Sequence, residues 1–174
     1  MSTQVPADLS EATVNEIAES RDEPDWLREA RLEALEAMDR LEMPDVIQTP
    51  GRRWTNLDQL DFDELADPLS QSDTTERVTD EGVEVLPFTE AVEEHPKLME
   101  AKFGSIIDPE TNYLTALSVA LFTTGTFIYV PEGVDAEDVT IRTEMNSRSL
   151  FSHTLVATEE SSSVTILERI SSGD

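Results

Sequence analysis

The sequence predicts a set of helices followed by a series of short β-strands. Apolar residues recur at helical spacing between Pro24 and Pro44. After Gly125 the chain becomes rich in β-branched and aromatic residues, in segments that begin at residues 126, 139, 153 and 164 without a helical period between them. The character of the chain changes near residue 105. We therefore predict an N-terminal helical region with a linker over residues 1–104, then a final helix and strands over residues 105–174.

Two helices are expected at the start of the chain. The first runs from Ser10 to about Ser20, with Ser10 as its N-cap. The second has Pro24 in its first turn and stops before Pro44, because proline lacks the amide hydrogen that a helix interior uses. Its predicted apolar stripe consists of Trp26, Ala30, Ala34, Leu35, Met38 and Leu41.

The stretch from Pro44 to Thr79 is interpreted as a linker. It contains the pair Pro50-Gly51 and a polar run of serine, glutamine, aspartate and threonine. Its apolar residues are expected to anchor a turn on the surface; they are Trp54, Leu57, Leu60 and Phe62.

The second half begins with one strand and two helical segments. Val83 to Phe88 alternates as a strand does, and Thr89 is expected to cap a helix that is interrupted at His95-Pro96. Tyr113 to Phe122 is expected to form a buried helix. The strands that follow are predicted at residues 126–130, 139–143, 153–157 and 164–168. Their spacing excludes a crossover helix between strands and allows a meander, a sandwich or the coils of a β-helix.

The charge of the chain limits its partners. It has 38 acidic residues against 12 basic ones, a formal net charge of −26, and only two lysines, Lys97 and Lys102. A field of this sign opposes nucleic acid and anionic lipid, so neither nucleic acid nor a membrane is expected as a partner. Such a composition resembles proteins of salt-in halophiles, in which molar salt screens the repulsion between acids. With no secretory signal and no apolar run of about 18 residues, we expect a cytoplasmic protein.

Motifs for catalysis are missing from the sequence. There is no cysteine, which excludes thiolate catalysis and cysteine-held clusters within this chain. His95 and His153 lack metal-site spacing, and we interpret both as structural or surface residues. The adjacent acids Glu137-Asp138 and Glu159-Glu160 are interpreted as solvated turns. No catalytic, cofactor-binding or metal-binding residue is therefore predicted.

One stretch is more specific than composition. Residues 127–134, Phe-Ile-Tyr-Val-Pro-Glu-Gly-Val, resemble a signature of the SufB/SufD family, the scaffold proteins of the SUF system for iron–sulfur cluster assembly. Other blocks resemble the same family in the same order: Glu23-Pro24-Asp25-Trp26-Leu27-Arg28 with Arg31-Leu32, Glu93-Glu94-His95-Pro96-Lys97-Leu98, Asn112 to Leu117 with Leu121 to Gly125, and Phe151 to Ala157 followed by Glu159-Glu160. Several ordered blocks make a chance resemblance improbable.

The resemblance implies a fold and partners. It implies a helical region that leads into a right-handed parallel β-helix, with C-terminal helices that bind the ATPase subunit SufC. The family is more than twice as long as this chain, so we expect the N-terminal portion, truncated within the first coils of the β-helix. A SufB-like paralogue and a SufC-like ATPase are the implied partners. A transient iron–sulfur cluster is expected only in the full complex, and no cofactor is expected in this fragment.

One position distinguishes the two paralogues. SufB-type chains place a cysteine after Glu-Gly, and that tripeptide falls here on Glu168-Arg169-Ile170. An alkyl side chain carries no persulfide and ligates no iron. The family's arginine falls on Arg142, but its partner asparagine is replaced by Glu144. The resemblance is therefore SufD-like, with no functional residue assigned.

Two other classes of protein stay open at this point. One is an acidic cytosolic adaptor or interaction domain unrelated to cluster assembly. The other is a small enzyme that uses its paired acids or His153. The chain stops soon after its last predicted strand, with no helix or polar cap over the edge of that strand. We therefore expect either more chain or a partner to cover this end.

Overall fold

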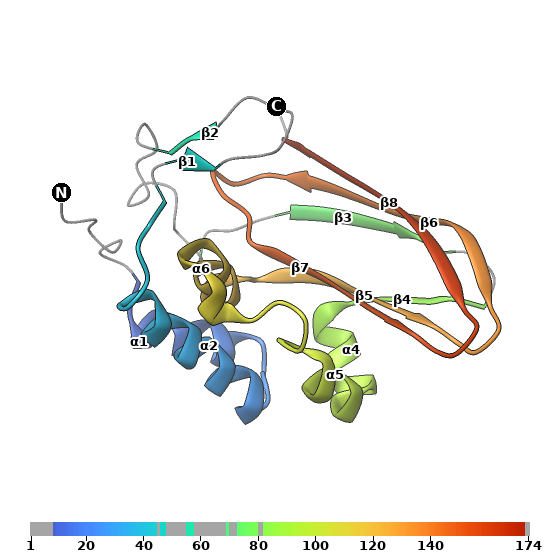
Figure 1. Ribbon diagram of the computed structural model, residues 1–174, viewed down its shortest axis with the longest axis horizontal. Coiled ribbons are helices and arrows are strands. Elements are labelled where there is room, and N and C mark those ends of the chain that lie inside the picture. Colours follow the sequence, from blue (N-terminus) through green and yellow to red (C-terminus); the bar gives the residue numbers. More distant parts are fainter. Residues whose placement is uncertain are drawn as a thin grey trace. The chain divides into compact units, whose positions relative to one another are not determined.

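The computed structural model describes residues 9–44, 46–47, 55–57, 69, 73–79 and 82–172 (Figure 1). Two compact units interleave along the chain. Unit 1 consists of residues 1–69 and 107–121, and unit 2 of residues 70–106 and 122–174. The division expected between residues 104 and 105 stays a prediction. Among the described residues, no helix combines the length and the apolarity that a membrane span requires.

Unit 1 is built mainly from helices. They are α1 (Glu11–Ser20), α2 (Asp25–Met38), the 3-10 helix η2 (Pro109–Thr111) and α6 (Tyr113–Leu121). A short antiparallel pair, β1 (Val46–Ile47) with β2 (Thr55–Asn56), also belongs to it. The predicted cap is confirmed, because the hydroxyl of Ser10 accepts a hydrogen bond from the amide of Thr13 at 3.3 Å. The predicted helix of residues 113–122 is confirmed as α6.

The buried face of α2 differs from the predicted apolar stripe. Trp26 is only partly buried, and the helix ends at Met38 rather than Leu41. The residues that are buried on α2 are Leu27, Arg31, Ala34, Ala37 and Met38. The predicted stripe is right for Ala34 and Met38 and displaced elsewhere, because a charged residue, Arg31, occupies the centre of the buried face.

Arg31 is fully buried and forms a bidentate ion pair with Glu23. Its Nε and Nη2 donate to the two carboxylate oxygens of Glu23 at 2.7 and 2.6 Å. Its Nη1 donates to the carbonyl oxygens of Val119 and Ala120 at 3.4 and 3.1 Å. These carbonyls lie in the last turn of α6, where a helix has unpaired acceptors and the negative end of its dipole. Arg31 therefore ties α2, α6 and the loop before α2 together.

The described residues of unit 2 form two three-stranded sheets and two short helices. The first sheet has the order β3 (Asp73–Val78), β6 (Asp135–Met145), β8 (Ser163–Ser172). The second has the order β4 (Glu84–Pro87), β5 (Thr124–Val130), β7 (Ser152–Thr158). The helices are α4 (Phe88–Glu94) and α5 (Pro96–Lys102), which lie beside β4 and β5 in Figure 1. All five predicted strands are present, and the helix break at His95-Pro96 is confirmed.

Two details of the predicted connections are wrong. The polar run assigned to the linker contains β3, which pairs with β6 from Asp73↔Met145 to Val78↔Thr140. Strand pairing there depends on a distant partner, so local composition did not reveal it. Thr89 is not a helix cap, because α4 already begins at Phe88. Leu57 is buried, and the other expected anchors lie outside the described residues: Trp54, Leu60 and Phe62.

The last four strands pair in parallel at an interval of 27 or 28 residues. Each residue of β5 lies opposite the residue 28 positions later in β7, from Thr124↔Ser152 to Val130↔Thr158. The same interval relates Asp135 of β6 to Ser163 of β8 and falls to 27 after an irregularity between Ala136 and Val139. The chain therefore passes twice through the same two-sheet layout.

An apolar core lies in this layout. Its buried members are Val83, Ile128, Val130, Ala136, Val139 and Ile141, with Val85, Val134, Val164 and Ile166 packed against them. The backbones approach closely at Gly125, where a Cβ would clash with the carbonyl oxygen of His153 and press on the Phe88 ring. This contact explains why glycine opens the strand-rich segment.

The predicted fold class is confirmed in part. Helices precede mixed sheets, and strands follow one another in parallel register as coils of a β-helix do. No closed β-helix is defined by the described residues, so that finer architecture stays a prediction.

Replacing Arg31 tests its role in unit 1. We expect Arg31→Met to lower the free energy of unfolding by about 3–5 kcal/mol, since Glu23 would keep a buried charge without its partner. Urea unfolding in molar KCl, followed by circular dichroism, measures the change.

Arg28→Met is the matched control. Arg28 lies one turn earlier on α2, is exposed, and donates to Asn15 at 2.7 Å. Exposed polar pairs contribute about 0–1 kcal/mol, so this variant is expected to unfold almost as the parent does. Equal effects of the two substitutions would contradict the structural role of Arg31.

Candidate functional site

The strands β7 and β8 form the outer edges of their sheets and carry exposed apolar side chains. Val156 on β7 is 37% exposed, and Leu167 and Ile170 on β8 are 64% and 60% exposed. Val156 lies opposite the core residue Ile128 in the parallel register. Parallel partners point to the same side of a sheet, so Val156 lies on the core side of β7. Among the described strands, these edges therefore each have one side without a neighbour and carry apolar surface to which further strands can be added.

Ile170 occupies the position at which the SufB-type cysteine was expected. It lies opposite the buried residue Thr143 and therefore on the same side of the sheet. Two residues earlier, the Glu168 carboxylate accepts a hydrogen bond from the Thr154 hydroxyl on β7 at 3.2 Å. The structure thus places an alkyl side chain, partly exposed, at the position onto which the resemblance maps the SufB-type cysteine.

Arg142 and Glu144 lie on the exposed side of β6. They alternate along the strand with the buried residues Ile141 and Thr143. The Arg142 Nη1 donates to a carboxylate oxygen of Glu76 on β3 at 3.0 Å, and both side chains are more than half exposed. Arg142, onto which the resemblance maps the family's arginine, therefore forms a surface ion pair with Glu76 on the neighbouring strand.

The two histidines have different surroundings. The ring of His153 meets Phe122 edge-on with centroids 4.6 Å apart, and Phe103 at 5.7 Å.

His95 lies between α4 and α5, where its Nε2 is 2.9 Å from a carboxylate oxygen of Glu84. One ligand atom each of Glu84, Glu94 and His95 lie within 4.8 Å of one another. Sequence spacing did not reveal this cluster, because Glu84 comes from the separate strand β4.

The paired acids lie on the surface. Glu137 and Asp138 are exposed on β6, and Glu159 and Glu160 are exposed after β7.

The Tyr129 hydroxyl donates to a carboxylate oxygen of Glu159 at 3.2 Å. Desolvation, this hydrogen bond and the charges of Glu159 and Glu84 raise the pKa of Tyr129 above its usual value. Such an environment disfavours the phenolate form of Tyr129.

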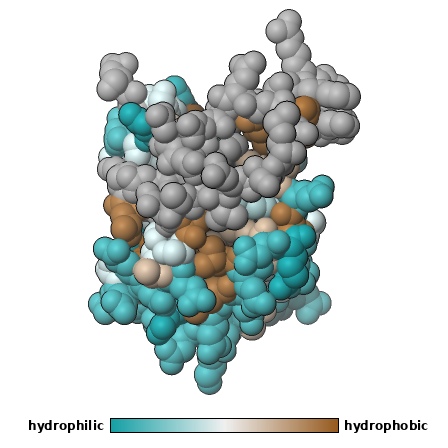
Figure 2. Space-filling model, turned by 90° about the vertical axis from the view of Figure 1, so that its left-hand side faces the viewer, coloured by the Kyte–Doolittle hydropathy of each residue, from teal (hydrophilic) through white to brown (hydrophobic). Residues whose placement is uncertain are grey.

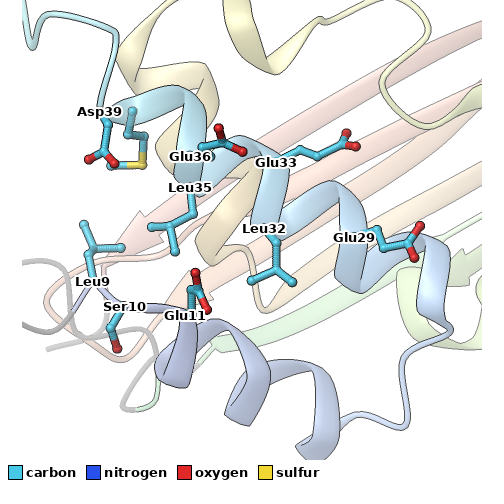
Figure 3. A pocket seen from close by; sticks show the side chains of 10 residues that line it. Leu9, Ser10, Glu11, Glu29, Leu32, Glu33, Leu35, Glu36 and Asp39 are labelled. Carbon is cyan, nitrogen blue, oxygen red and sulfur yellow. The ribbon is translucent and has the colours of Figure 1, made fainter.

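Unit 1 contains a groove between α1 and α2 with a volume of about 500 Å³ (Figure 3). Its apolar lining residues are Leu9, Leu32, Leu35 and Met38, and its acidic ones are Glu11, Glu29, Glu33, Glu36 and Asp39. No basic residue lines it among the described residues. The groove therefore disfavours phosphate-bearing ligands such as nucleotides. Figure 2 likewise shows hydrophilic side chains over much of the visible described surface, with apolar groups gathered between them.

Burial and a nearby charge also affect a tyrosine of unit 1. Burial, with the Asp39 carboxylate as a smaller cause, raises the pKa of Tyr113 at the start of α6. Tyr113 is thus a neutral core residue over the physiological pH range.

Parallel strand pairs whose outer strands carry exposed apolar side chains suit a fold that is extended by further strands. Comparison with known proteins agrees: residues 53–141, more than half of the chain, match the family model described as the SufBD protein N-terminal region. The chain belongs to the SufBD family.

Individual relatives cover nearly the whole chain but only part of their own length. SufD of Bacillus subtilis, an iron–sulfur cluster assembly protein, is 31% identical over 87% of this chain and 43% of its own. The chloroplastic SufBD family protein ABCI8 of Arabidopsis thaliana is 28% identical over 94% of this chain and 38% of its own. A SufBD family protein of Synechocystis is 30% identical over 79% of this chain and 30% of its own. The chain thus spans less than half the length of these relatives.

The exposed edges predict self-association. Because Val156 and Ile170 present apolar surface on the outer strands of their sheets, the 174-residue chain alone is expected to bind a hydrophobic dye and to form oligomers, even in molar KCl. Light scattering and dye fluorescence measure this. Ile170→Lys is expected to reduce both signals.

Ile106→Lys is the matched control, since it makes the same change in charge. Ile106 is 89% exposed but lies in the segment after α5, outside the strands of the sheets. Strictly monomeric behaviour of the parent chain, or equal effects of the two substitutions, would count against association through the strand edges.

Proposed function

We propose that this chain is the N-terminal portion of a SufD-like scaffold subunit in the SUF complex for iron–sulfur cluster assembly. The observation that carries the proposal is the parallel register of β5 with β7 and β6 with β8, in a chain of the SufBD family. Such pairs repeat a two-sheet layout to which further strands can be added. The proposed architecture is a right-handed parallel β-helix that continues from β7 and β8.

The SufD-like assignment depends on the side chain at position 170. Since Ile170 has no sulfur, this chain is proposed to complete the assembly interface without relaying sulfur itself. The 31% identity to SufD of Bacillus subtilis is consistent with this role. The family's pair of arginine and asparagine is not reproduced either, because Glu144 stands where the resemblance expects the asparagine.

The proposed partners are a SufB-like paralogue and a SufC-like ATPase. The paralogue would supply the thiol, and the ATPase would supply the free energy of nucleotide hydrolysis for rearrangement. The chain is proposed to have no catalytic activity of its own and to act in the cytoplasm. The iron–sulfur cluster is then the product of the complex rather than a resident cofactor of this portion.

Affinity capture of the endogenous gene product tests the proposal. A tag on the protein, purification in molar KCl and denaturing mass spectrometry give the mass of the bait and its partners together. We expect a bait far heavier than 19.4 kDa, eluting with a SufB-like chain and an ATPase.

A bait of 19.4 kDa that elutes alone would contradict the scaffold role. It would favour the acidic adaptor instead. An untagged strain processed in the same way controls for proteins that adhere to the resin at high salt.

A further inference from the structure

The side chains of Glu84, Glu94 and His95 form a cluster that the scaffold function does not use. Glu84 is the first residue of β4, Glu94 is the last residue of α4, and His95 separates α4 from α5. One ligand atom of each residue lies within 4.8 Å of the other two. The fold therefore brings an imidazole and two carboxylates together from two different elements.

The position of the His95 ring is fixed by its neighbours. Its centroid is 5.5 Å from that of Phe127 and 6.1 Å from that of Tyr129, with the Tyr129 ring inclined by only 28° to it. Both aromatic residues lie on β5, beside β4. The ring is thus held against the sheet, with Nε2 2.9 Å from the Glu84 carboxylate oxygen. A ligand oriented in advance loses less conformational freedom when it binds a metal.

The composition of the cluster selects the class of metal. Carboxylate oxygens alone favour Mg²⁺ and Ca²⁺, whereas an imidazole nitrogen favours borderline ions such as Zn²⁺ and Co²⁺. Three protein ligands leave a fourth tetrahedral position for water. The side chains of His95 and Glu84 are only 28% and 35% exposed, so salt screens their interaction with an ion less than it screens fully exposed acids.

We propose that Glu84, Glu94 and His95 bind one divalent ion of the Zn²⁺ class. In this site His95 Nε2 and one oxygen of each carboxylate are the ligands. Binding brings the three atoms closer than their present 4.8 Å limit, through rotation of the exposed Glu94 side chain. The inference does not depend on the scaffold function, because it concerns an ion held by unit 2 alone.

Cobalt titration tests the site directly. The probe is Co²⁺, added to the full chain in molar KCl with excess Mg²⁺ to occupy the acidic surface. We expect one Co²⁺ per chain, visible ligand-field absorption of the tetrahedral type, and loss of that absorption when Zn²⁺ is added. His95→Asn is expected to weaken binding by at least the roughly 10–100-fold that loss of an outer-shell partner costs.

The second histidine supplies the matched control. His153→Asn removes an imidazole that packs against Phe122 and Phe103, and it is expected to leave Co²⁺ affinity unchanged. The chain has only two histidines, so imidazole resonances in nuclear magnetic resonance spectra report each directly. Zn²⁺ is expected to shift the His95 resonances and to leave those of His153 in place.

Two further variants keep the test decisive. Glu94→Gln changes an exposed residue at the end of α4 and is expected to fold normally while it weakens Co²⁺ binding. Glu90→Gln, an exposed acid in the first turn of the same helix, is expected to have no effect. If the parent binds Co²⁺ no more tightly than His95→Asn or Glu94→Gln, the cluster is an ion pair only and the proposal fails.

Discussion

The parallel pairing of β5 with β7 and of β6 with β8 is the constraint on which unit 2 depends. It sets the interval of 28 residues between strands that lie side by side, and it lets both sheets share one apolar core. Close approach of β5 and β7 requires a glycine at position 125, because a Cβ there would clash with the His153 carbonyl oxygen. The same pairing leaves β7 and β8 with one unpaired side each among the described strands. Further strands of the proposed scaffold would pair with these sides.

Unit 1 depends on a different interaction, the buried ion pair of Arg31 with Glu23. A buried charge is costly unless its partner and hydrogen bonds are all present, and here the guanidinium also binds the final carbonyls of α6. Directional contacts of the guanidinium, and not apolar burial alone, therefore set how α2 packs against α6. The groove between α1 and α2 adds a negative, partly apolar surface to the same unit.

The sequence predicted the order of elements well where local patterns decide the structure. The cap at Ser10, the helix break at His95-Pro96 and the strands after Gly125 all depend on neighbouring residues. Features that depend on distant partners were missed or misplaced. Strand β3 needs β6, the buried face of α2 depends on Arg31, and the cluster at His95 needs Glu84 from β4. The family resemblance, carried by residues 127–134 and the ordered blocks around them, was confirmed by the family comparison.

Hydrogen exchange tests most directly whether β7 and β8 are interior strands of a longer scaffold. Exchange is measured by mass spectrometry on the 174-residue chain and on the native gene product in its complex. The account predicts that peptides from β7 and β8 exchange rapidly in the chain alone and become protected in the complex, while β5 is protected in both. Equal exchange of β7 and β8 in the two samples would contradict the account.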